Sequence, residues 1–309
     1  MKYQKYIDGL KTDLINKTYV VTGANSGIGY EVSRYLLYLN ANVIFACRSE
    51  ERALNAINKI REEVKTGKTI FLKYDQASLE SIKNFSETIK REYQIDGLIC
   101  NAGIYYPKQN SKTHDNIEMT FGTNYLGQYY LVSLLYDYLN KIPNSRIVIV
   151  SSLTAYTAKQ VKFNEIDRLS RNKKYGFSKL LLSKEAYELT QKNDNVKIFL
   201  THPGVCSTNI LFNKDTGLSS SFARAGRRFL NIFTHSASKA ALTTLQGIIS
   251  TDYEKNYIKP RGPFAISGYP KFTRIPKRYH SNGLIVETNE YLQKVAISQK
   301  IWQMTIILV

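Results

Sequence analysis

The chain has 309 residues, and its hydrophobic fraction of 43% is typical of a soluble globular protein. It carries 43 lysines and arginines against 25 aspartates and glutamates, a net charge of +18. The lysines are spread along most of the chain, so we predict a solvated basic surface and no nucleic-acid partner. No apolar run approaches the roughly 20 residues that span a bilayer, and the polar N-terminus resembles no secretory signal, so we predict a cytoplasmic location.

Cysteine and histidine usage excludes two further classes. The three cysteines are too few and too scattered for a disulfide framework. The four histidines show no metal-ligand spacing, so we predict no metal site.

Short apolar runs alternate with helix-length amphipathic segments through the first two-thirds of the chain. The runs are rich in Val and Ile and nearly continuous, as expected of strands buried on both faces of a parallel sheet. They cover residues 18–22, 42–47, 69–74, 96–100, 146–151 and 196–201. Helical spacing is found at 28–39, 49–64 and 78–93, and serines begin the last two segments. This order predicts an α/β fold, a Rossmann-type doubly wound parallel sheet with helices on both faces. No linker divides the chain, so we predict one domain over 1–309.

A glycine-rich turn, "TGANSGIG" (22–29), joins the first strand to the first periodic helix. Its glycines at 23, 27 and 29 allow a tight turn and a close approach of the backbone to a ligand. The helix N-terminus that follows favours an anion. This position predicts a site for a dinucleotide pyrophosphate.

Six segments in order resemble the short-chain dehydrogenase/reductase family. They are "TGANSGIG", "CNAG" (100–103), "FGTNYLGQYYL" (121–131), "VSS" (150–152), "YGFSK" (175–179) and "HPGVCSTNI" (202–210). The resemblance implies that 18–210 form the cofactor-binding and catalytic core, and that 205–235 and 260–309 supply the substrate pocket and C-terminal elements. Ser152 and Tyr175 lie 23 positions apart, farther than is common in the family. This longer loop resembles the branch that contains retinol dehydrogenases and the WW-domain oxidoreductase.

The turn and the resemblance together imply a set of cofactor-binding residues. Within it, Asp75 is expected to reach the adenine amino group, Asn101 to line the adenosine and Thr208 to hold the carboxamide. The set is Gly23, Asn25, Ser26, Gly27, Ile28, Gly29, Arg48, Asp75, Gln76, Asn101, Ala102, Gly103, Tyr175, Lys179, Pro203, Gly204 and Thr208.

The end of the second strand favours NADP(H) over NAD(H). Cys47 stands where members of the family that prefer NAD place an aspartate, and Arg48 follows it. An arginine can bind a 2′-phosphate through two hydrogen bonds and stack on adenine. Glu50 and Glu51 are close enough in sequence to leave the preference open.

Tyr175 and Lys179 form the only Tyr-x-x-x-Lys in the chain and lie one above the other on a helix. Tyrosine has an unperturbed pKa of about 10, and a neighbouring ammonium favours its phenolate. We therefore predict that Tyr175 is a general acid/base tuned by Lys179. The resemblance implies that Ser152 binds the substrate oxygen and that Asn124 supports a proton-relay water.

The leading hypothesis is an NADP(H)-dependent oxidoreductase acting on an alcohol/carbonyl pair that is apolar. The alternative is a non-catalytic NADP(H)-binding sensor or scaffold of the same fold. The presence of all four candidate catalytic residues disfavours it, and the arginine after the second strand disfavours a methyltransferase. The sequence leaves open whether the protein forms a homo-oligomer.

Residues 219–233, "SSSFARAGRRFLNIF", predict a basic amphipathic helix. We favour a hydrophobic lid over the substrate pocket. Association with an anionic membrane surface is the alternative.

Overall fold

The described structure is a computed structural model that covers residues 1–192, 194–205 and 236–298. Within these residues, eight strands form one sheet in the order β3-β2-β1-β4-β5-β6-β7-β8. Thr208 and the predicted lid at 219–233 lie outside the described residues.

The sheet confirms the predicted fold and adds one strand of opposite direction. Neighbouring strands are parallel from β3 across to β7, and β8 is antiparallel to β7. The strands are β1 (Thr18–Thr22), β2 (Asn42–Cys47), β3 (Thr69–Lys73), β4 (Gly97–Cys100), β5 (Arg146–Val150), β6 (Lys197–Thr201), β7 (Tyr257–Pro260) and β8 (Pro270–Thr273). All six predicted strands are present, with ends that differ by at most one residue. The antiparallel strand β8 was not predicted from the sequence.

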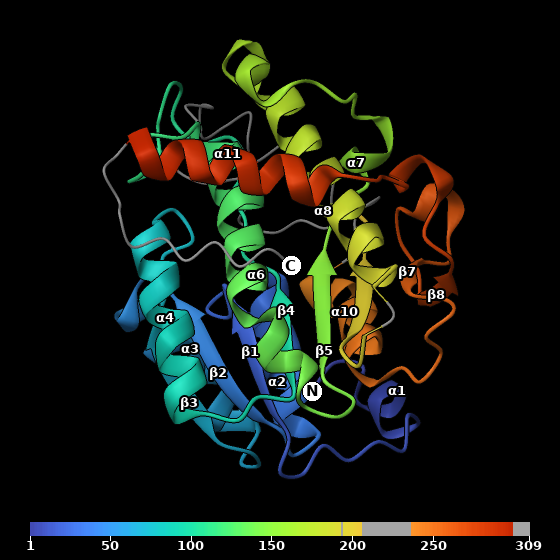
Figure 1. Cartoon of the computed structure of the whole chain (residues 1–309). Coiled ribbons are helices and arrows are strands. Elements are labelled where there is room, and N and C mark those ends of the chain that lie inside the picture. Colours follow the sequence, from blue (N-terminus) through green and yellow to red (C-terminus); the bar gives the residue numbers. More distant parts are fainter. Residues whose placement is uncertain (193, 206–235, 299–309) are drawn as a thin grey trace, which may run out of the picture.

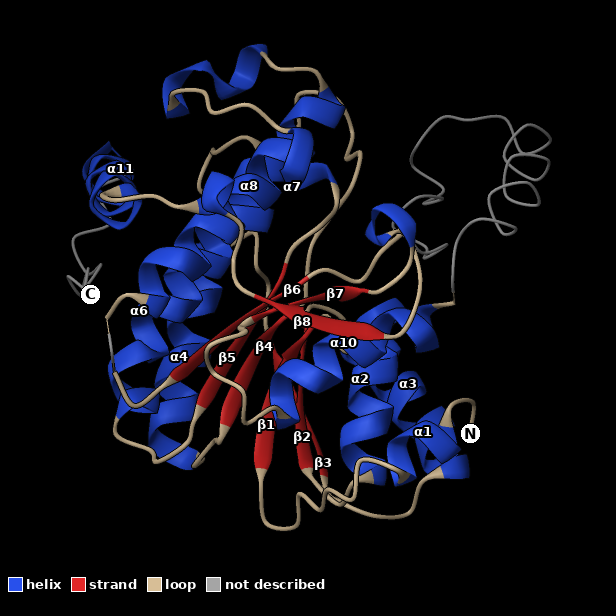
Figure 2. Cartoon of the chain, turned by 90° about the vertical axis from the view of Figure 1, so that its right-hand side faces the viewer, coloured by secondary structure: helices blue, strands red, loops and turns tan. Residues whose placement is uncertain are grey.

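Helices cover both faces of the sheet (Figures 1 and 2). The α-helices are α1 (Gln4–Asp8), α2 (Gly27–Tyr38), α3 (Glu50–Glu63), α4 (Leu79–Glu92), α5 (Met119–Phe121), α6 (Gly127–Asn140), α7 (Thr154–Thr157), α8 (Arg171–Thr190), α10 (Ala237–Ile249) and α11 (Leu284–Ser298). A π-helical turn spans Gly122–Leu126, and 3₁₀ turns span Phe163–Arg168, Pro263–Ala265 and Lys277–Tyr279. Ser49 and Ser78 accept backbone hydrogen bonds as the N-caps of α3 and α4, as the sequence predicted.

Successive strand residues alternate between two buried cores. Val20 and Ile147 belong to the core under α4, α6 and α8, whereas their neighbours Val21 and Val148 belong to the core under α2, α3 and α10. This alternation is the period-2 pattern of a strand. Because both faces are buried, both sets of positions are apolar, which explains the continuous runs in the sequence.

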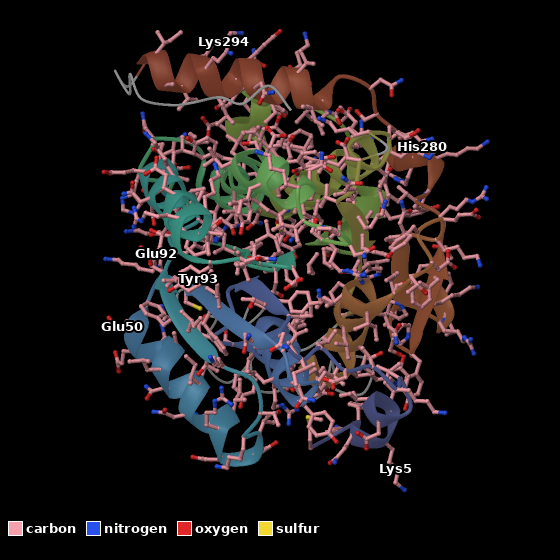
Figure 3. All side chains as sticks on the ribbon, turned by 60° about the horizontal axis from the view of Figure 1, so that its bottom comes forward. Lys5, Glu50, Glu92, Tyr93, His280 and Lys294 are labelled. Atoms are coloured by element: carbon pink, nitrogen blue, oxygen red, sulfur yellow. The ribbon has the colours of Figure 1, made fainter. Side chains whose placement is uncertain are left out.

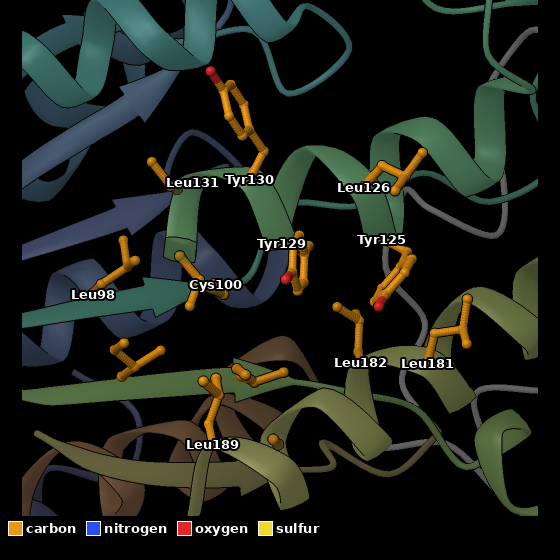
Figure 4. Close-up of a cluster of buried hydrophobic side chains, with 14 of the residues drawn as sticks. Leu98, Cys100, Tyr125, Leu126, Tyr129, Tyr130, Leu131, Leu181, Leu182 and Leu189 are labelled. Carbon is orange, nitrogen blue, oxygen red and sulfur yellow. The ribbon is translucent and has the colours of Figure 1, made fainter. Parts of the chain in front are cut away.

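The C-terminal helix α11 lies across α6 and α8 (Figure 1). The Tyr125 hydroxyl hydrogen-bonds to Thr288 Oγ1 at 2.7 Å, and the Tyr129 hydroxyl donates to Asn289 Oδ1 at 2.9 Å. Figure 4 shows Tyr129 of α6 and Tyr125 of the preceding π-helical turn pointing toward the helix that carries Leu181 and Leu182, α8. The Glu188 carboxylate accepts from the first two backbone N–H groups of α11. These buried bonds fix α11 on the layer that carries the candidate catalytic helix.

The charged surface is spread over the molecule, as the sequence predicted. Lys5, Glu50 and Lys294 lie on separate parts of the outer surface and project outward (Figure 3). None of the described helices combines the length and the apolar character needed to cross a membrane.

Candidate active site

The glycine turn between β1 and α2 has the geometry of a ligand cradle. Gly23 and Gly27 have φ of 66° and 57°, in the left-handed region that favours glycine. A Cβ at Gly29 would clash with the Gly23 carbonyl oxygen and the Asn101 amide nitrogen. Glycine is therefore required here by backbone conformation and by space, and the turn fits a pyrophosphate at the N-terminus of α2.

Asn101 joins this turn to the neighbouring strand. Its Nδ2 donates to the Thr22 carbonyl oxygen at 2.9 Å. The Thr22 hydroxyl in turn accepts from the backbone N–H groups of Asn101 and Ala102, at 3.0 and 2.9 Å. The ends of β1 and β4 are thereby held together, so the "NAG" segment and the glycine turn form one wall.

A cavity of about 1330 Å³ lies at the carboxyl edge of the sheet, beside this wall. Most of the predicted cofactor residues line it: Gly23, Asn25, Ser26, Gly27, Ile28, Arg48, Asp75, Gln76, Asn101, Ala102, Gly103, Tyr175, Lys179 and Pro203. Gly29 supports the turn from behind, and Gly204 has a φ of 83° with its N–H donating to His202 Nδ1. The fold therefore brings predicted residues from six separate segments of the chain together around one cavity.

One end of the cavity is basic. Arg48, Arg52 and Lys59 line it from β2 and α3, and all three side chains are exposed. Burial raises the pKa of the Cys47 thiol to about 11, so this side chain is neutral at physiological pH. Asp75 is the only acid among the described lining residues. Arg52 was missed in the sequence, although its place in the first turn of the predicted helix, four positions after Arg48, was a usable signal.

Asp75 and Gln76 play different parts in the wall. The Asp75 carboxylate accepts from the backbone N–H of Ala77 at 3.0 Å, which fixes the turn after β3. The Gln76 side-chain amide donates to the Thr123 carbonyl at 2.6 Å and to the Ala102 carbonyl at 3.2 Å. Gln76 thus positions the "NAG" backbone in addition to lining the cavity.

Tyr175 and Lys179 lie on successive turns of α8 at the other end of the cavity. The Lys179 ammonium nitrogen is 5.9 Å from the centroid of the Tyr175 ring and donates to the Val150 carbonyl at 2.9 Å. Lys179 is only 4% exposed, and burial lowers the pKa of its ammonium to about 8. A cation is thus held beside the phenol, under the backbone of Gly103.

Asn124 is fully buried in the π-helical turn and links two parts of the site. Its Oδ1 accepts from the Ile104 N–H at 2.7 Å, and its Nδ2 donates to the Ile104 carbonyl at 2.9 Å. The same Nδ2 donates to Ser178 Oγ at 3.3 Å. Asn124 therefore anchors the segment after β4 to the helix that carries Tyr175 and Lys179.

The two serines after β5 differ in where their hydroxyls point. Ser151 lines the cavity, but its buried hydroxyl is bonded to the Lys179 carbonyl and to Ser183 Oγ, at 3.0 and 2.7 Å. The half-buried Ser152 hydroxyl accepts from the N–H and hydroxyl of Thr154 at 3.3 and 3.0 Å. Ser151 is therefore engaged within the fold. Ser152 is not among the described residues that line the cavity, and its contact with a substrate stays a prediction.

A glycine cradle at a Rossmann-type sheet edge, with a Tyr–Lys pair on one cavity wall, defines a nicotinamide-dependent oxidoreductase. The family model of the short chain dehydrogenase matches residues 17–218, and the chain belongs to this family. It is an oxidoreductase that acts on the CH–OH group with NAD(P).

Curated relatives lie in the branch that the longer Ser–Tyr loop indicated. Polyprenol dehydrogenase of Danio rerio is 32% identical over 276 residues, 81% of this chain and 84% of that protein. Retinol dehydrogenase 14 of Homo sapiens is 36% identical and covers 63% of each chain. WW domain-containing oxidoreductase of Gallus gallus is 39% identical over 57% of this chain and 40% of that protein.

Solved structures share the fold. An uncharacterised protein from Mycobacterium paratuberculosis superposes with a TM-score of 0.70 at 24% identity, over 93% of this chain and 95% of that chain. The Pseudomonas aeruginosa RhlG/NADP active-site complex gives a TM-score of 0.61 at 15% identity, over 78% and 92%.

Proposed function

We propose that the protein is an NADP(H)-dependent oxidoreductase that interconverts an alcohol and a carbonyl by hydride transfer. The observation that carries this proposal is the Tyr175–Lys179 pair, held on one helix beside the cavity. When bound, the nicotinamide cofactor supplies or accepts the hydride. The glycine turn would hold its pyrophosphate, and Lys179 would hold the nicotinamide ribose. Thr208 is proposed to bind the carboxamide.

The proton moves through this chain's own residues. In the reduction direction, the Tyr175 hydroxyl gives its proton to the oxygen of the developing alkoxide. The Ser152 hydroxyl donates a hydrogen bond to the same oxygen and stabilises its charge. The Lys179 ammonium favours the phenolate that remains. Asn124 supports the relay that returns a proton, since its amide already lies against Ser178 and the backbone of Ile104.

The preference for NADP(H) rests on charge at the basic end of the cavity. A 2′-phosphate there would meet Arg48, with Arg52 in the first turn of α3 beside it, and no carboxylate from β2. The neutral Cys47 sulfur occupies the end of the strand, where it receives hydrogen bonds from the backbone of Asn25 and Ala24. Glu50 and Glu51 are exposed and are not among the lining residues, which supports the preference.

An apolar substrate fits the walls near Tyr175. Ile104, Tyr105, Tyr106 and Pro107 line that part of the cavity. Two of the relatives are named for polyprenol and retinol, both long apolar alcohols. We therefore propose a substrate of this kind. We also keep the cytoplasm as the proposed location and one domain over 1–309 as its organisation.

The sensor or scaffold remains the second candidate function. Burial of Lys179 argues against it, because placing an ammonium in a site that lowers its pKa to about 8 costs folding energy. Such perturbed groups concentrate at catalytic sites. A protein that only binds NADP(H) could use Lys179 to hold the ribose, but it would gain nothing from the lowered pKa of this ammonium.

A screen for turnover separates the two functions. Aldehydes and ketones of increasing apolar length are mixed with NADPH or NADH, and the absorbance of the reduced cofactor is followed. We expect oxidation of NADPH with at least one long apolar carbonyl, and slower oxidation of NADH. Tight NADPH binding with no turnover across the whole panel would favour the sensor.

A further inference from the structure

The ring of Tyr105 contacts the ring of Tyr175 edge to face. Their centroids are 4.8 Å apart and their planes are inclined by 85°. This is the arrangement that aromatic quadrupoles prefer, and such pairs are directional. Both tyrosines line the cavity, so the contact lies at the site of proton transfer.

Two further bonds determine where the Tyr105 ring can lie. The preceding residue, Ile104, is held at both its N–H and its carbonyl by the Asn124 side chain. At the other end, the Tyr105 hydroxyl donates to Asn172 Oδ1 at 2.7 Å. Asn172 is three residues before Tyr175 on α8, and therefore on the same side of that helix. The ring of Tyr105 is thus fixed from its backbone and from its hydroxyl.

The next residues strengthen the same attachment. Tyr106 has a φ of 60°, a left-handed conformation that is unfavourable for a tyrosine. Its ring lies 4.1 Å from the guanidinium carbon of Arg171, the first residue of α8, and 5.2 Å from the centroid of Tyr105. Arg171 Nη1 also donates to the Pro107 carbonyl at 3.5 Å. The segment 105–107 is therefore bound to the beginning of α8 at several points.

We propose that Tyr105 is a positioning residue that fixes the ring of Tyr175 for proton transfer. This inference rests on the proposed function. Proton transfer requires the phenol oxygen within hydrogen-bond reach of the substrate oxygen, and a small displacement costs much of the rate. Tyr175 is only half-buried. The ring of Tyr105 packs against the ring of Tyr175, and the bond to Asn172 holds Tyr105 in that place.

Four variants test the proposal with NADPH and the best carbonyl from the screen. Tyr105→Leu removes the aromatic ring and the hydroxyl, and we expect the single-turnover rate of NADPH oxidation to fall about ten- to a hundredfold. Tyr105→Phe keeps the ring and loses only the bond to Asn172, so its rate should stay within about two- to tenfold of that of the natural protein. Asn172→Ala should match it, and Tyr105→Phe with Asn172→Ala should be no slower than either alone.

Other readouts separate positioning from simple packing or substrate binding. The NADPH dissociation constant and the KM for the carbonyl should change little, while the rate falls. Tyr253→Leu is the control, because Tyr253 packs near Lys197 at the amino end of β6, away from the cavity. It should leave turnover unchanged. Tyr105→Leu with a normal rate, or with a change in carbonyl KM alone, would overturn the inference.

The result with Tyr175→Phe separates a failure of the inference from a failure of the proposed function. If Tyr175→Phe keeps turnover, the proposed function fails and the positioning role fails with it. If Tyr175→Phe is inactive and Tyr105→Leu is fully active, only the positioning role fails. Circular dichroism and thermal unfolding of each variant show that the comparison is between folded proteins.

Discussion

The two ends of the cavity use positive charge in opposite ways. At the basic end, Arg48, Arg52 and Lys59 are exposed to solvent. At the catalytic end, Lys179 is buried and bonded to a main-chain carbonyl, beside the fully buried Asn124. An exposed cation costs the fold little, and it interacts weakly with any partner that it reaches only through water. A buried cation costs the fold more, but it acts strongly on the groups beside it.

This difference predicts how each end responds to substitution. At the exposed end, a lost charge should change only the affinity for a ligand that carries the opposite charge. At the buried end, a lost group should change the chemistry, and for Lys179 also the stability. Four substitutions test this contrast, and the largest effect is expected at Tyr175.

Tyr175→Phe should lower turnover by roughly 10²- to 10⁴-fold, the usual contribution of a positioned acid/base. NADPH affinity, measured by fluorescence, should stay near its original value because the ring is retained. Turnover with the best carbonyl is the decisive measurement. A variant with near-normal turnover would show that the proton comes from elsewhere.

Lys179→Met should lose most activity and yet stabilise the fold near pH 7. The natural side chain has an unfolded pKa near 10.5 and a folded pKa of about 8, so the fold disfavours its charged form. That cost is roughly 3 kcal/mol at about 1.4 kcal/mol per pKa unit, and the lost bond to Val150 offsets roughly 1 kcal/mol of it. Denaturant unfolding at pH 7 should therefore show a gain of about 2 kcal/mol.

The gain should shrink as pH rises from about 8 toward 10.5. In that window the unfolded natural protein binds more protons at this site than the folded one, so the stability of the natural protein rises with pH. Lys174→Met is the matched control, since Lys174 is also buried on α8 but lies 3.5 Å from the Glu118 carboxylate. It should destabilise the fold. Equal losses of stability in both variants would contradict the contrast.

Arg48→Ala should weaken NADPH binding roughly ten- to a hundredfold, since a charge-assisted hydrogen bond contributes about 1.5–3 kcal/mol. NADH binding should change little, because NADH has no 2′-phosphate. Fluorescence titration with both cofactors measures the ratio. If both affinities fall equally, Arg48 does not distinguish the two cofactors.

The features that depend on a local pattern of residues could be predicted from the sequence. The glycines at 23 and 27, the paired Tyr175 and Lys179, and the strands β1 to β6 could be predicted because their chemistry requires fixed spacing or continuous apolar runs. The strands β7 and β8 gave no such signal, because each has four residues and a proline at one end. In β8 the proline is the first residue of an edge strand, a position that tolerates it.

The remaining parts of the site depend on contacts between distant segments. No spacing in the sequence indicates that Tyr105 would meet Tyr175, 70 positions later, or that Gln76 would hold the backbone of Ala102 and Thr123. Likewise, no spacing in the sequence indicates that the Ser151 hydroxyl would bond to Ser183, and the substrate-binding role of Ser152 stays a prediction. From the sequence alone, the choice of Ser152 over Ser151 depends on where the resembling family places its catalytic serine.

Arg52→Ala should give the smallest effect and sharpen the contrast most. Arg52 lines the basic end from the first turn of α3, four positions beyond Arg48. We expect Arg48 to bond the 2′-phosphate and the exposed Arg52 to act on it only through water, so the contribution of Arg52 should be about 0.5–1 kcal/mol, or roughly two- to fivefold in NADPH affinity. The effect should fade as salt is raised, because exposed charges are screened within about 8 Å at physiological ionic strength. Lys68→Ala is the control, since Lys68 is equally exposed but precedes β3, at the amino edge of the sheet. It removes the same unit of charge and should leave NADPH affinity unchanged.

Equal losses of NADPH affinity in Arg52→Ala and Lys68→Ala would mean that net charge, and not the place of Arg52, attracts the cofactor. A loss in Arg52→Ala that persists at high salt would mean a direct, desolvated bond, and the contrast between the two ends would then need revision.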